Sequence, residues 1–200
     1  MCYLDKIKKF VYDELNSDCS GHDYYHAIRV FNNAKQILSK MDNEFINDKI
    51  IYVSTLIHDC VDHKLFNDIE VQIEKIKKLL KDDFTNEEIS QILEIIQTIS
   101  FSKGNTLTNI NAQIVCDADR LDAIGAIGII RTIEYGTIHN RKFNDGTNNS
   151  TINHFYDKLL KLKDLMYTNV GKEMAINRHQ FLEQFLKQYY KELGEEKCLL

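Results

Sequence analysis

The chain has 200 residues, of which 44% are hydrophobic, and it contains no proline and only eight glycines. This length makes one domain the default, and the shortage of turn residues favours helices over a many-stranded sheet. A net charge of −5 and a pI near 5.8 argue against a broad surface for nucleic acid or an anionic membrane, because such partners select basic faces.

The first two periodic segments predict helices. Apolar side chains between residues 4 and 15 repeat at helical spacing and predict a short amphipathic opening helix. A second helix is predicted to begin at Ser20, with Ser20 as its N-cap and Asp23 at the third position, where a negative charge suits the helix dipole.

Three polar side chains are predicted on the first turns of this second helix. His22 and His26 are four residues apart, and Arg29 follows His26 by three, so all three are brought toward one side. The plainer interpretation is that His22 caps or solvates the helix start and that Arg29 makes a surface ion pair. Spacing alone leaves both interpretations open.

The stretch 51–64 is an apolar helical run that ends at the adjacent pair His58 and Asp59. These two side chains share one edge of the predicted helix. An imidazole beside a carboxylate suits a divalent ion such as Mn²⁺, Fe²⁺, Co²⁺, Ni²⁺ or Zn²⁺, although a lone His-Asp pair more often has no ligand role. A further acid, Asp62, follows one turn later.

The middle of the chain predicts two more helices and a loop. Apolar residues repeat at helical spacing over 69–80, and Thr85 with Glu88 forms a capping box that opens the next helix. Residues 100–111 form a loop by composition. Lys103 in this loop could reach an anion or could simply be solvated.

The segment 114–136 is predicted to be a helix that carries three aspartates near its start. Asp117, Asp119 and Asp122 would repel one another and lose hydration unless a cation or basic partners compensate. Asp119 and Asp122 lie on one side, whereas Asp117 points elsewhere and is predicted to be a solvent-facing charge or an N-terminal helix charge. The two glycines that follow most simply permit close helix packing.

The last third of the chain contains a polar stretch and two more predicted helices. Residues 139–153 are either a mobile flap over a site or a plain surface loop. A helix is predicted from His154, and the last helix is predicted over about 170–193, with Gly194 as its C-cap.

The cysteine content and the hydropathy of the chain indicate the cellular compartment. Five cysteines, an odd number without a CxxC motif, predict neither a disulfide framework nor a zinc knuckle and fit a reducing compartment. The N-terminal residues lack the apolar core of a signal peptide, and the longest apolar run, 123–130, is far too short to span a bilayer. We therefore expect a soluble cytoplasmic protein that has no membrane partner.

Two histidines and two aspartates occur in the order H…HD…D on three separate predicted helices. Together they can hold one divalent ion and leave positions open for water and a substrate oxygen. Spacing alone does not show that the three helices converge. The predicted fold is all-α, a single-domain helical bundle over residues 1–200. The four residues are His26, His58, Asp59 and Asp119.

The segments HAIRV, LIHDCVDHK and DADRLDAIGAIGIIRT resemble the three signatures of the HD-domain metal-dependent phosphohydrolases. The resemblance continues through SFSKG and HFYDKLLKLKDLM and covers roughly residues 20–178. The long third signature and its trailing segment resemble in particular the bacterial subfamily of YpgQ-like and YedJ-like HD proteins. The resemblance implies a helical bundle of the HD-domain type.

This resemblance implies that one divalent ion (Mn²⁺, Co²⁺, Ni²⁺, Fe²⁺, Zn²⁺ or Mg²⁺) is the cofactor. Asp119 is favoured over Asp117 and Asp122 as the fourth ligand, because the ADRL motif defines the register. Asp62 stands three residues after the HD aspartate, where several nucleotide-handling members carry a catalytic Glu or Asp. His22 is a supporting or substrate group rather than a ligand. The implied ligands are His26, His58, Asp59 and Asp119.

The implied reaction is hydrolysis of a phosphate ester or anhydride, with a nucleoside mono- or triphosphate as the expected substrate. Asp62 would accept or relay a proton. Two alternatives stay open: a non-catalytic HD module that binds a nucleotide or protein as a regulator, and a di-iron oxygenase, which would need more ligands. A homo-oligomer is compatible with the sequence. The expected phosphate-binding residues are Arg29, Lys64, Lys103 and Arg120.

Overall fold

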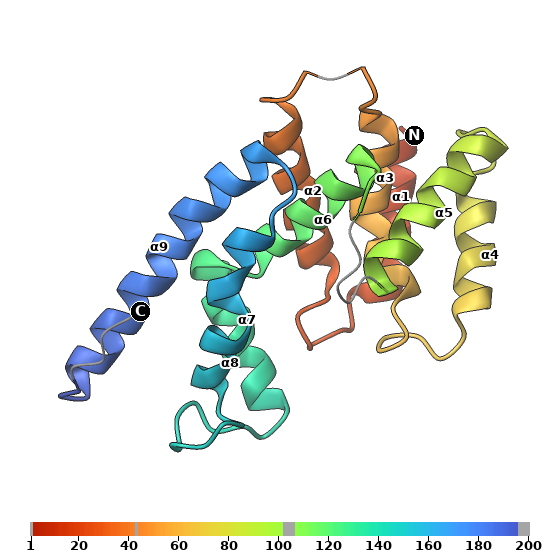
Figure 1. The fold of residues 1–200 in the computed structure, drawn as a ribbon. Coiled ribbons are helices and arrows are strands. Elements are labelled where there is room, and N and C mark those ends of the chain that lie inside the picture. Colours follow the sequence, from red (N-terminus) through yellow and green to blue (C-terminus); the bar gives the residue numbers. More distant parts are fainter. Residues whose placement is uncertain (1, 43, 102–106, 196–200) are drawn as a thin grey trace. The chain divides into compact units, whose positions relative to one another are not determined.

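The computed structural model describes residues 2–42, 44–101 and 107–195, and these residues form helices and no strand. The prediction of an all-α fold is therefore confirmed (Figure 1). The elements are α1 (Tyr3–Leu15), α2 (Tyr24–Leu38), α3 (Asp48–Ile57), the 3₁₀ turn η1 (His58–Val61), α4 (Ile69–Leu80), α5 (Asn86–Phe101), α6 (Ile110–Asp122), α7 (Gly125–Ile138), α8 (Thr151–Asp157), the 3₁₀ segment η2 (Leu159–Leu165) and α9 (Asn169–Glu192).

The chain forms two compact units, Met1–Asp119 and Arg120–Leu200, whose boundary falls inside α6. Unit 1 holds α1 to α5 and most of α6, and unit 2 holds the end of α6 and everything that follows. The single domain predicted over residues 1–200 stays a prediction. Among the described residues, no helix combines the length and apolar character that a bilayer crossing requires.

Helix α3 is the centre of unit 1. It contacts α1, α2 and α5, and seven of its ten residues are buried, among them Ile51, Leu56 and Ile57. A helix that is apolar on nearly all sides is stable only inside a core. The helix ends at Ile57, and η1, which begins at His58, packs against α1, α4 and α5. The polar pair at this end is therefore held among packed helices.

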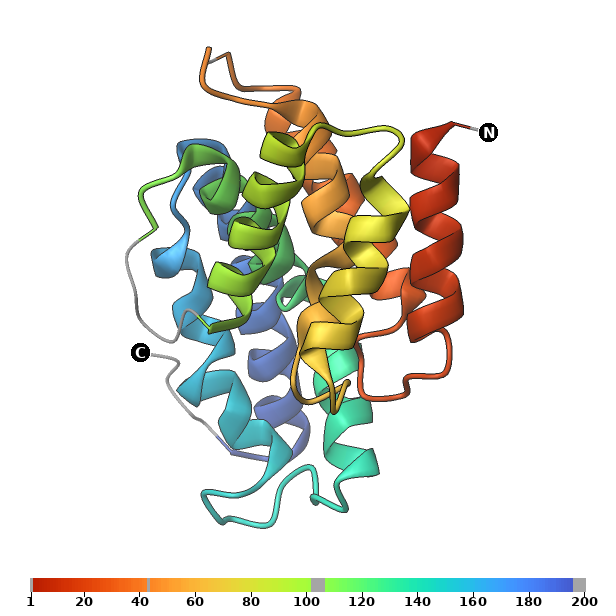
Figure 2. The ribbon, with the colours of Figure 1, turned by 90° about the vertical axis from the view of Figure 1, so that its right-hand side faces the viewer.

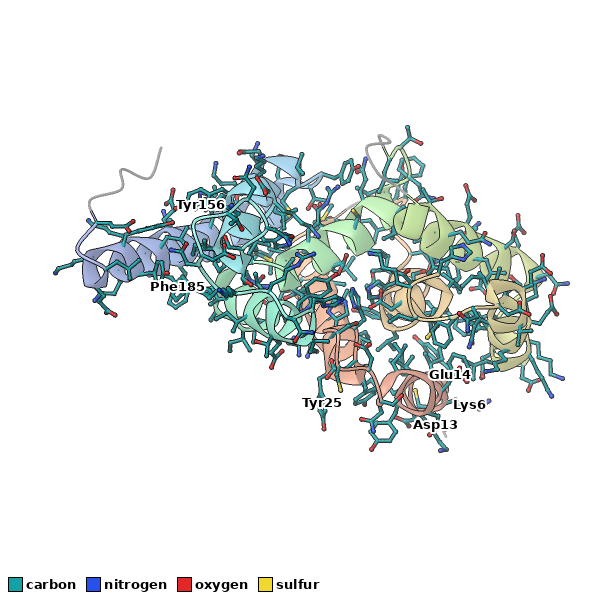
Figure 3. The ribbon with its side chains drawn as sticks, turned by 90° about the horizontal axis from the view of Figure 1, so that it is seen from below. Lys6, Asp13, Glu14, Tyr25, Tyr156 and Phe185 are labelled. Carbon is teal, nitrogen blue, oxygen red and sulfur yellow. The ribbon has the colours of Figure 1, made fainter. Side chains whose placement is uncertain are left out.

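Helices α4 and α5 lie side by side in unit 1, joined by a short turn (Figures 1 and 2). Helix α1 is tied to α4 by Glu14, labelled on α1 in Figure 3, which accepts hydrogen bonds from Lys75 Nζ and Gln72 Nε2, both at 2.9 Å. On α2, the side chain of Tyr25 points away from the helices (Figure 3) and is 60% exposed.

Unit 2 packs α7, α8 and η2 against the long helix α9. A row of aromatic rings fills the space between them: Phe155 of α8 stacks on Phe185 of α9, and Phe143 meets both Phe155 and Tyr189 edge to face. The helix expected from His154 is real but shorter, because α8 ends at Asp157 and the chain continues as 3₁₀ turns.

The helix predicted over residues 114–136 is interrupted, and that prediction is wrong at one point. Helix α6 ends at Asp122 and α7 begins at Gly125, which has φ +78. This left-handed backbone favours glycine. A Cβ on Gly128 would overlap the carbonyl oxygen of Ala123. The glycines therefore make a sharp turn between two helices.

The capping box predicted at the start of α5 is confirmed. The backbone N–H of Glu88 donates to Thr85 Oγ1 at 3.2 Å, and the backbone N–H of Thr85 donates to Glu88 Oε2 at 2.8 Å. The second bond lowers the pKa of Glu88. Its stabilising contribution is therefore present above the ordinary glutamate pKa and is lost as the pH falls through the lowered value.

Replacing Thr85 with alanine is expected to lower the free energy of unfolding by about 1 kcal/mol, because the substitution removes the hydroxyl that accepts the Glu88 N–H. Urea denaturation near neutral pH measures this difference. The matched variant Thr85→Ser keeps a hydroxyl and should stay close to wild type. Equal stability of Thr85→Ala and wild type would contradict a capping role.

Candidate metal centre

Three elements of unit 1 carry the predicted ligands. His26 lies in the first turn of α2, where Asp23 Oδ1 accepts its backbone N–H at 2.7 Å. Asp23 is therefore the N-cap of α2, and the prediction that Ser20 caps this helix is wrong. The pair His58 and Asp59 opens η1 at the end of α3, and the fourth ligand lies in α6.

The side chains of these four residues converge. His26 Nε2 lies 3.3 Å from His58 Nε2, 3.3 Å from Asp59 Oδ2 and 3.4 Å from Asp119 Oδ1. His58 Nε2 lies 3.4 Å from Asp59 Oδ1 and 3.8 Å from Asp119 Oδ1. Among the described residues, His26, His58 and Asp119 present ligand atoms that all lie within 4.8 Å of one another. The structure thus brings together what the sequence could only place in order.

One hydrogen bond decides the tautomer of His58, and therefore which ring nitrogen holds the lone pair. His58 Nδ1 lies 2.8 Å from the backbone carbonyl oxygen of Thr55. A carbonyl oxygen only accepts, so Nδ1 carries the proton, and in the neutral ring Nε2 holds a lone pair. This arrangement, in which the far nitrogen donates to a carbonyl, is the usual support of a metal-binding histidine.

The cluster is largely shielded from water. His26, His58 and Asp59 are 1%, 4% and 6% exposed, whereas the Asp119 side chain is 36% exposed and lies where the cluster meets solvent. Burial raises the pKa of Asp59, but the neighbouring His58 and His26 outweigh burial and lower this pKa well below the ordinary value. The buried carboxylate is therefore ionised.

These donors fit a divalent cation. Asp59 Oδ2 is buried and has no hydrogen-bond partner of good geometry, and the two imidazole Nε2 atoms face each other at 3.3 Å, a separation at which one ion can bind both. Ligands about 2.1 Å from one tetrahedral ion stand about 3.4 Å apart. Two imidazoles and two carboxylates with this spacing are a donor set for a borderline or hard divalent ion.

Asn33 supports the cluster and was not found by sequence reasoning. It is buried in α2, and its side-chain Nδ2 donates to the backbone carbonyl of Ala118 in α6 at 2.9 Å. This bond joins the helix of His26 to the helix of Asp119 one residue before the ligand. Because the partners are 85 residues apart, only a buried asparagine in an apolar stripe of α2 could have suggested it.

The other predicted site residues have more ordinary surroundings. Asp62 is half-buried directly after η1, and its Oδ1 accepts the backbone N–H of Lys64 at 2.8 Å. Lys64 is exposed, and Arg29 is half-buried one turn after His26. The roles predicted for these residues stay predictions.

Two more residues were predicted to bind phosphate, Arg120 and Lys103, and of these the structure describes Arg120. Arg120 donates to the carbonyl of Leu165, and its guanidinium lies 4.9 Å from the centre of the Tyr167 ring. Its proposed contact with phosphate stays a prediction. Lys103 lies outside the described residues.

The remaining aspartates of α6 are buried. Asp122 is 1% exposed and pairs with Arg131 at 2.9 Å, so its charge is compensated within unit 2. Asp117 is fully buried, and the prediction that it faces solvent is wrong. Its neighbours Val115, Cys116 and Ala118 are also buried, because this part of α6 is covered on several sides.

The polar stretch 139–153 is anchored to its own unit. The backbone N–H of Thr151 donates to the carbonyl of Lys142 at 2.9 Å, and Asn144 Nδ2 donates to the Tyr189 hydroxyl at 3.1 Å. Phe143 adds the aromatic contacts described above. These contacts favour the plain surface loop over the mobile flap.

A buried cluster of two histidines and two aspartates, drawn from three elements of an all-helical unit, defines a candidate metal centre of the H…HD…D type. The sequence model of the HD domain family matches residues 23–124, which include all four clustered residues. The chain belongs to the HD domain family, a family of metal-dependent phosphohydrolases.

The relatives extend this similarity to almost the whole chain. YpgQ of Bacillus subtilis is 32% identical over 194 residues, which cover 94% of this chain and 93% of YpgQ. The crystal structure of YpgQ in complex with ADP has a TM-score of 0.81 and 33% identity, covering 94% of this chain and 97% of YpgQ. A crystal structure of an HD-superfamily hydrolase from Bacillus thuringiensis has a TM-score of 0.78 and 38% identity, covering 96% and 97%. The chain is thus YpgQ-like.

Proposed function

We propose that the protein hydrolyses a nucleotide at a phosphoester or phosphoanhydride bond, with His26, His58, Asp59 and Asp119 as ligands of one divalent ion. The observation that carries the proposal is the convergence of these four side chains, in which His58 presents a lone pair on Nε2. A nucleoside mono- or triphosphate is the substrate class. The structure of YpgQ in complex with ADP supports a nucleotide ligand in this subfamily.

Each residue of the site would have a separate role in the hydrolysis. A bound divalent ion would supply Lewis acidity for activating water and polarising a phosphoryl oxygen. Asp62, half-buried directly after η1, would accept or relay a proton. Substrate would enter from the side of Asp119, because its side chain is the partly exposed member of the cluster. Arg29, Lys64 and Arg120 would bind phosphate oxygens, the arginines in bidentate fashion.

A matrix of metals against nucleotides tests the proposal. Metal-free protein is loaded with Mn²⁺, Co²⁺, Ni²⁺, Fe²⁺, Zn²⁺ or Mg²⁺ and assayed on nucleoside mono-, di- and triphosphates, and each product is identified as phosphate or pyrophosphate. We expect turnover of at least one nucleotide that depends on the added ion. Metal binding without release of either product from any nucleotide would instead favour the non-catalytic regulator. Two irons per chain would favour the oxygenase.

A further inference from the structure

Helix α7 places most of its small residues inward and most of its large aliphatic residues outward. Its inner face packs against α8 and α9 within unit 2, and the contact is close, because a Cβ on Gly136 would overlap the side chain of Thr151. The residues of the inner face are Gly125, Gly128, Ile129, Thr132 and Gly136. The outer face carries four isoleucines, which we call the isoleucine face. They are Ile127, Ile130, Ile133 and Ile138, which are 38%, 53%, 39% and 48% exposed.

The isoleucine face is too apolar for a helix side that only meets water. At about 100° per residue, its four positions fall within less than half of the helix circumference, and Glu134 is the only charged residue of α7 within that arc. The cation of α7, Arg131, has a side chain that is 17% exposed and pairs with Asp122 at 2.9 Å. The solvent side of a surface helix normally carries charged and polar residues. A continuous apolar patch in their place marks an interaction surface.

The isoleucine face is complementary to a second copy of itself. Ile127 stands three residues before Ile130, and Ile133 stands three residues after it. In an antiparallel pair of identical helices with a two-fold axis at Ile130, that residue meets its own copy, and Ile127 meets the partner's Ile133. The symmetry repeats the second contact, so isoleucine meets isoleucine at every central position of the pair.

The single charge on this face is also complementary to a second copy. The N-cap of α7 is Ile124, so no side chain accepts a hydrogen bond from the N–H groups of the first turn. In the same antiparallel pair, Glu134 lies opposite the partner's Ala126, which belongs to that first turn. A carboxylate near a helix N-terminus is stabilised by the helix dipole. Glu134 of each copy therefore supplies the negative charge that the start of the partner's α7 lacks.

We propose that the isoleucine face binds a second copy of this chain, with α7 packed antiparallel on the partner's α7 about a two-fold axis at Ile130. The inference goes beyond the proposed function and does not rest on it, because the candidate metal centre lies in unit 1 and α7 lies in unit 2. One helix face buries less than the roughly 800 Å² per partner of a standard interface. The dimer is therefore reversible, with a Kd on the order of 1–100 μM.

Sedimentation velocity over a concentration series tests the surface. Wild type should change from monomer to dimer as its concentration rises through such a Kd, whereas Ile130→Asp should stay monomeric, because the axis would bring two carboxylates together in an apolar contact. Ile176→Asp is the matched control, since Ile176 lies on α9, is 43% exposed and should leave the dimer intact. Far-UV circular dichroism checks that each variant is folded. A monomeric wild type, as expected if another part of the chain covers this face, overturns the proposal, and so does a dimer in Ile130→Asp or an equal loss in Ile176→Asp.

A pair of opposite charges then tests the antiparallel register, and it also serves if Ile130→Asp fails to fold. Ile127→Lys or Ile133→Glu alone should weaken dimerisation by roughly tenfold or more, because each variant places a charge against an isoleucine in both symmetric contacts. An equimolar mixture of the two variants should form a mixed dimer, in which the introduced lysine meets the introduced glutamate and the other contact stays isoleucine against isoleucine. Native mass spectrometry distinguishes the mixed dimer from the two homodimers when one variant carries a tag. A mixture that contains no more dimer than the separate variants overturns the proposed pairing.

Discussion

Replacement of His58 with alanine is expected to abolish binding of the divalent ion and phosphohydrolase activity together. His58 Nε2 lies within 3.8 Å of three other candidate ligands, and its Nδ1 is held by the Thr55 carbonyl, so the substitution removes an oriented nitrogen donor from the set of four. The apolar helix α3 that precedes it should keep the fold. Metal content per chain and turnover are measured on one preparation, with far-UV circular dichroism as the check on helicity.

Two further variants make this test decisive. Asp59→Asn preserves the size of the side chain but removes the charge of a buried carboxylate, so it should lose the ion even if His58→Ala folds poorly. His63→Ala changes an exposed histidine five residues further along and should keep both metal and activity. Wild-type metal content in His58→Ala or Asp59→Asn would remove that residue from the ligand set.

The helices could be predicted from the sequence because their determinants are local. The apolar repeat of α4 and the reciprocal cap at Thr85 and Glu88 are short-range patterns, and the structure contains both. The break before Gly125 could not be predicted, because alanine, glycine and isoleucine continue the apolar pattern of a helix through it. The spacing of apolar residues does not reveal that one glycine among them has a positive φ.

The start of α2 shows a second limit of local reasoning. Ser20 and Asp23 are both good N-cap residues, and the choice between them depends on Asp18, which binds the hydroxyl and the N–H of Ser20. Asp23 is left to cap the helix. The N-cap prediction failed because a side chain two residues upstream competes for Ser20.

For the candidate site too, the local pattern could be predicted from the sequence, but the contacts between distant segments could not. The order H…HD…D could be recognised in the sequence, whereas the convergence of α2, η1 and α6 depends on packing between segments far apart in the chain. Asn33 and the carbonyl of Ala118 form a contact of this kind. Asp117 was misassigned for the same reason, since a carboxylate on a helix gives no sign that other elements cover it.

Replacement of Asp62 with asparagine is expected to keep the ion and to lower turnover by roughly 10²–10⁴, the usual contribution of a positioned acid or base. Asp62 follows the HD pair by three residues, and one of its oxygens, Oδ1, accepts the N–H of Lys64. That leaves Oδ2 as the basic atom for a proton of the attacking water. Asparagine keeps the accepting oxygen and the size of the side chain, but it replaces the basic oxygen with an amide.

The competing explanation is that Asp62 only closes the turn before Lys64. Asparagine closes such a turn nearly as well, so in that case the variant would match wild type in both stability and turnover. Asp68→Asn is the matched control, because Asp68 also accepts a backbone N–H, that of Val71 at the start of α4, and has no proposed role in the chemistry. Bound metal and single-turnover hydrolysis are measured on the same preparation of each variant. A loss confined to Asp62→Asn, with metal retained, places the carboxylate in the proton transfer, whereas full activity in Asp62→Asn removes it from the mechanism.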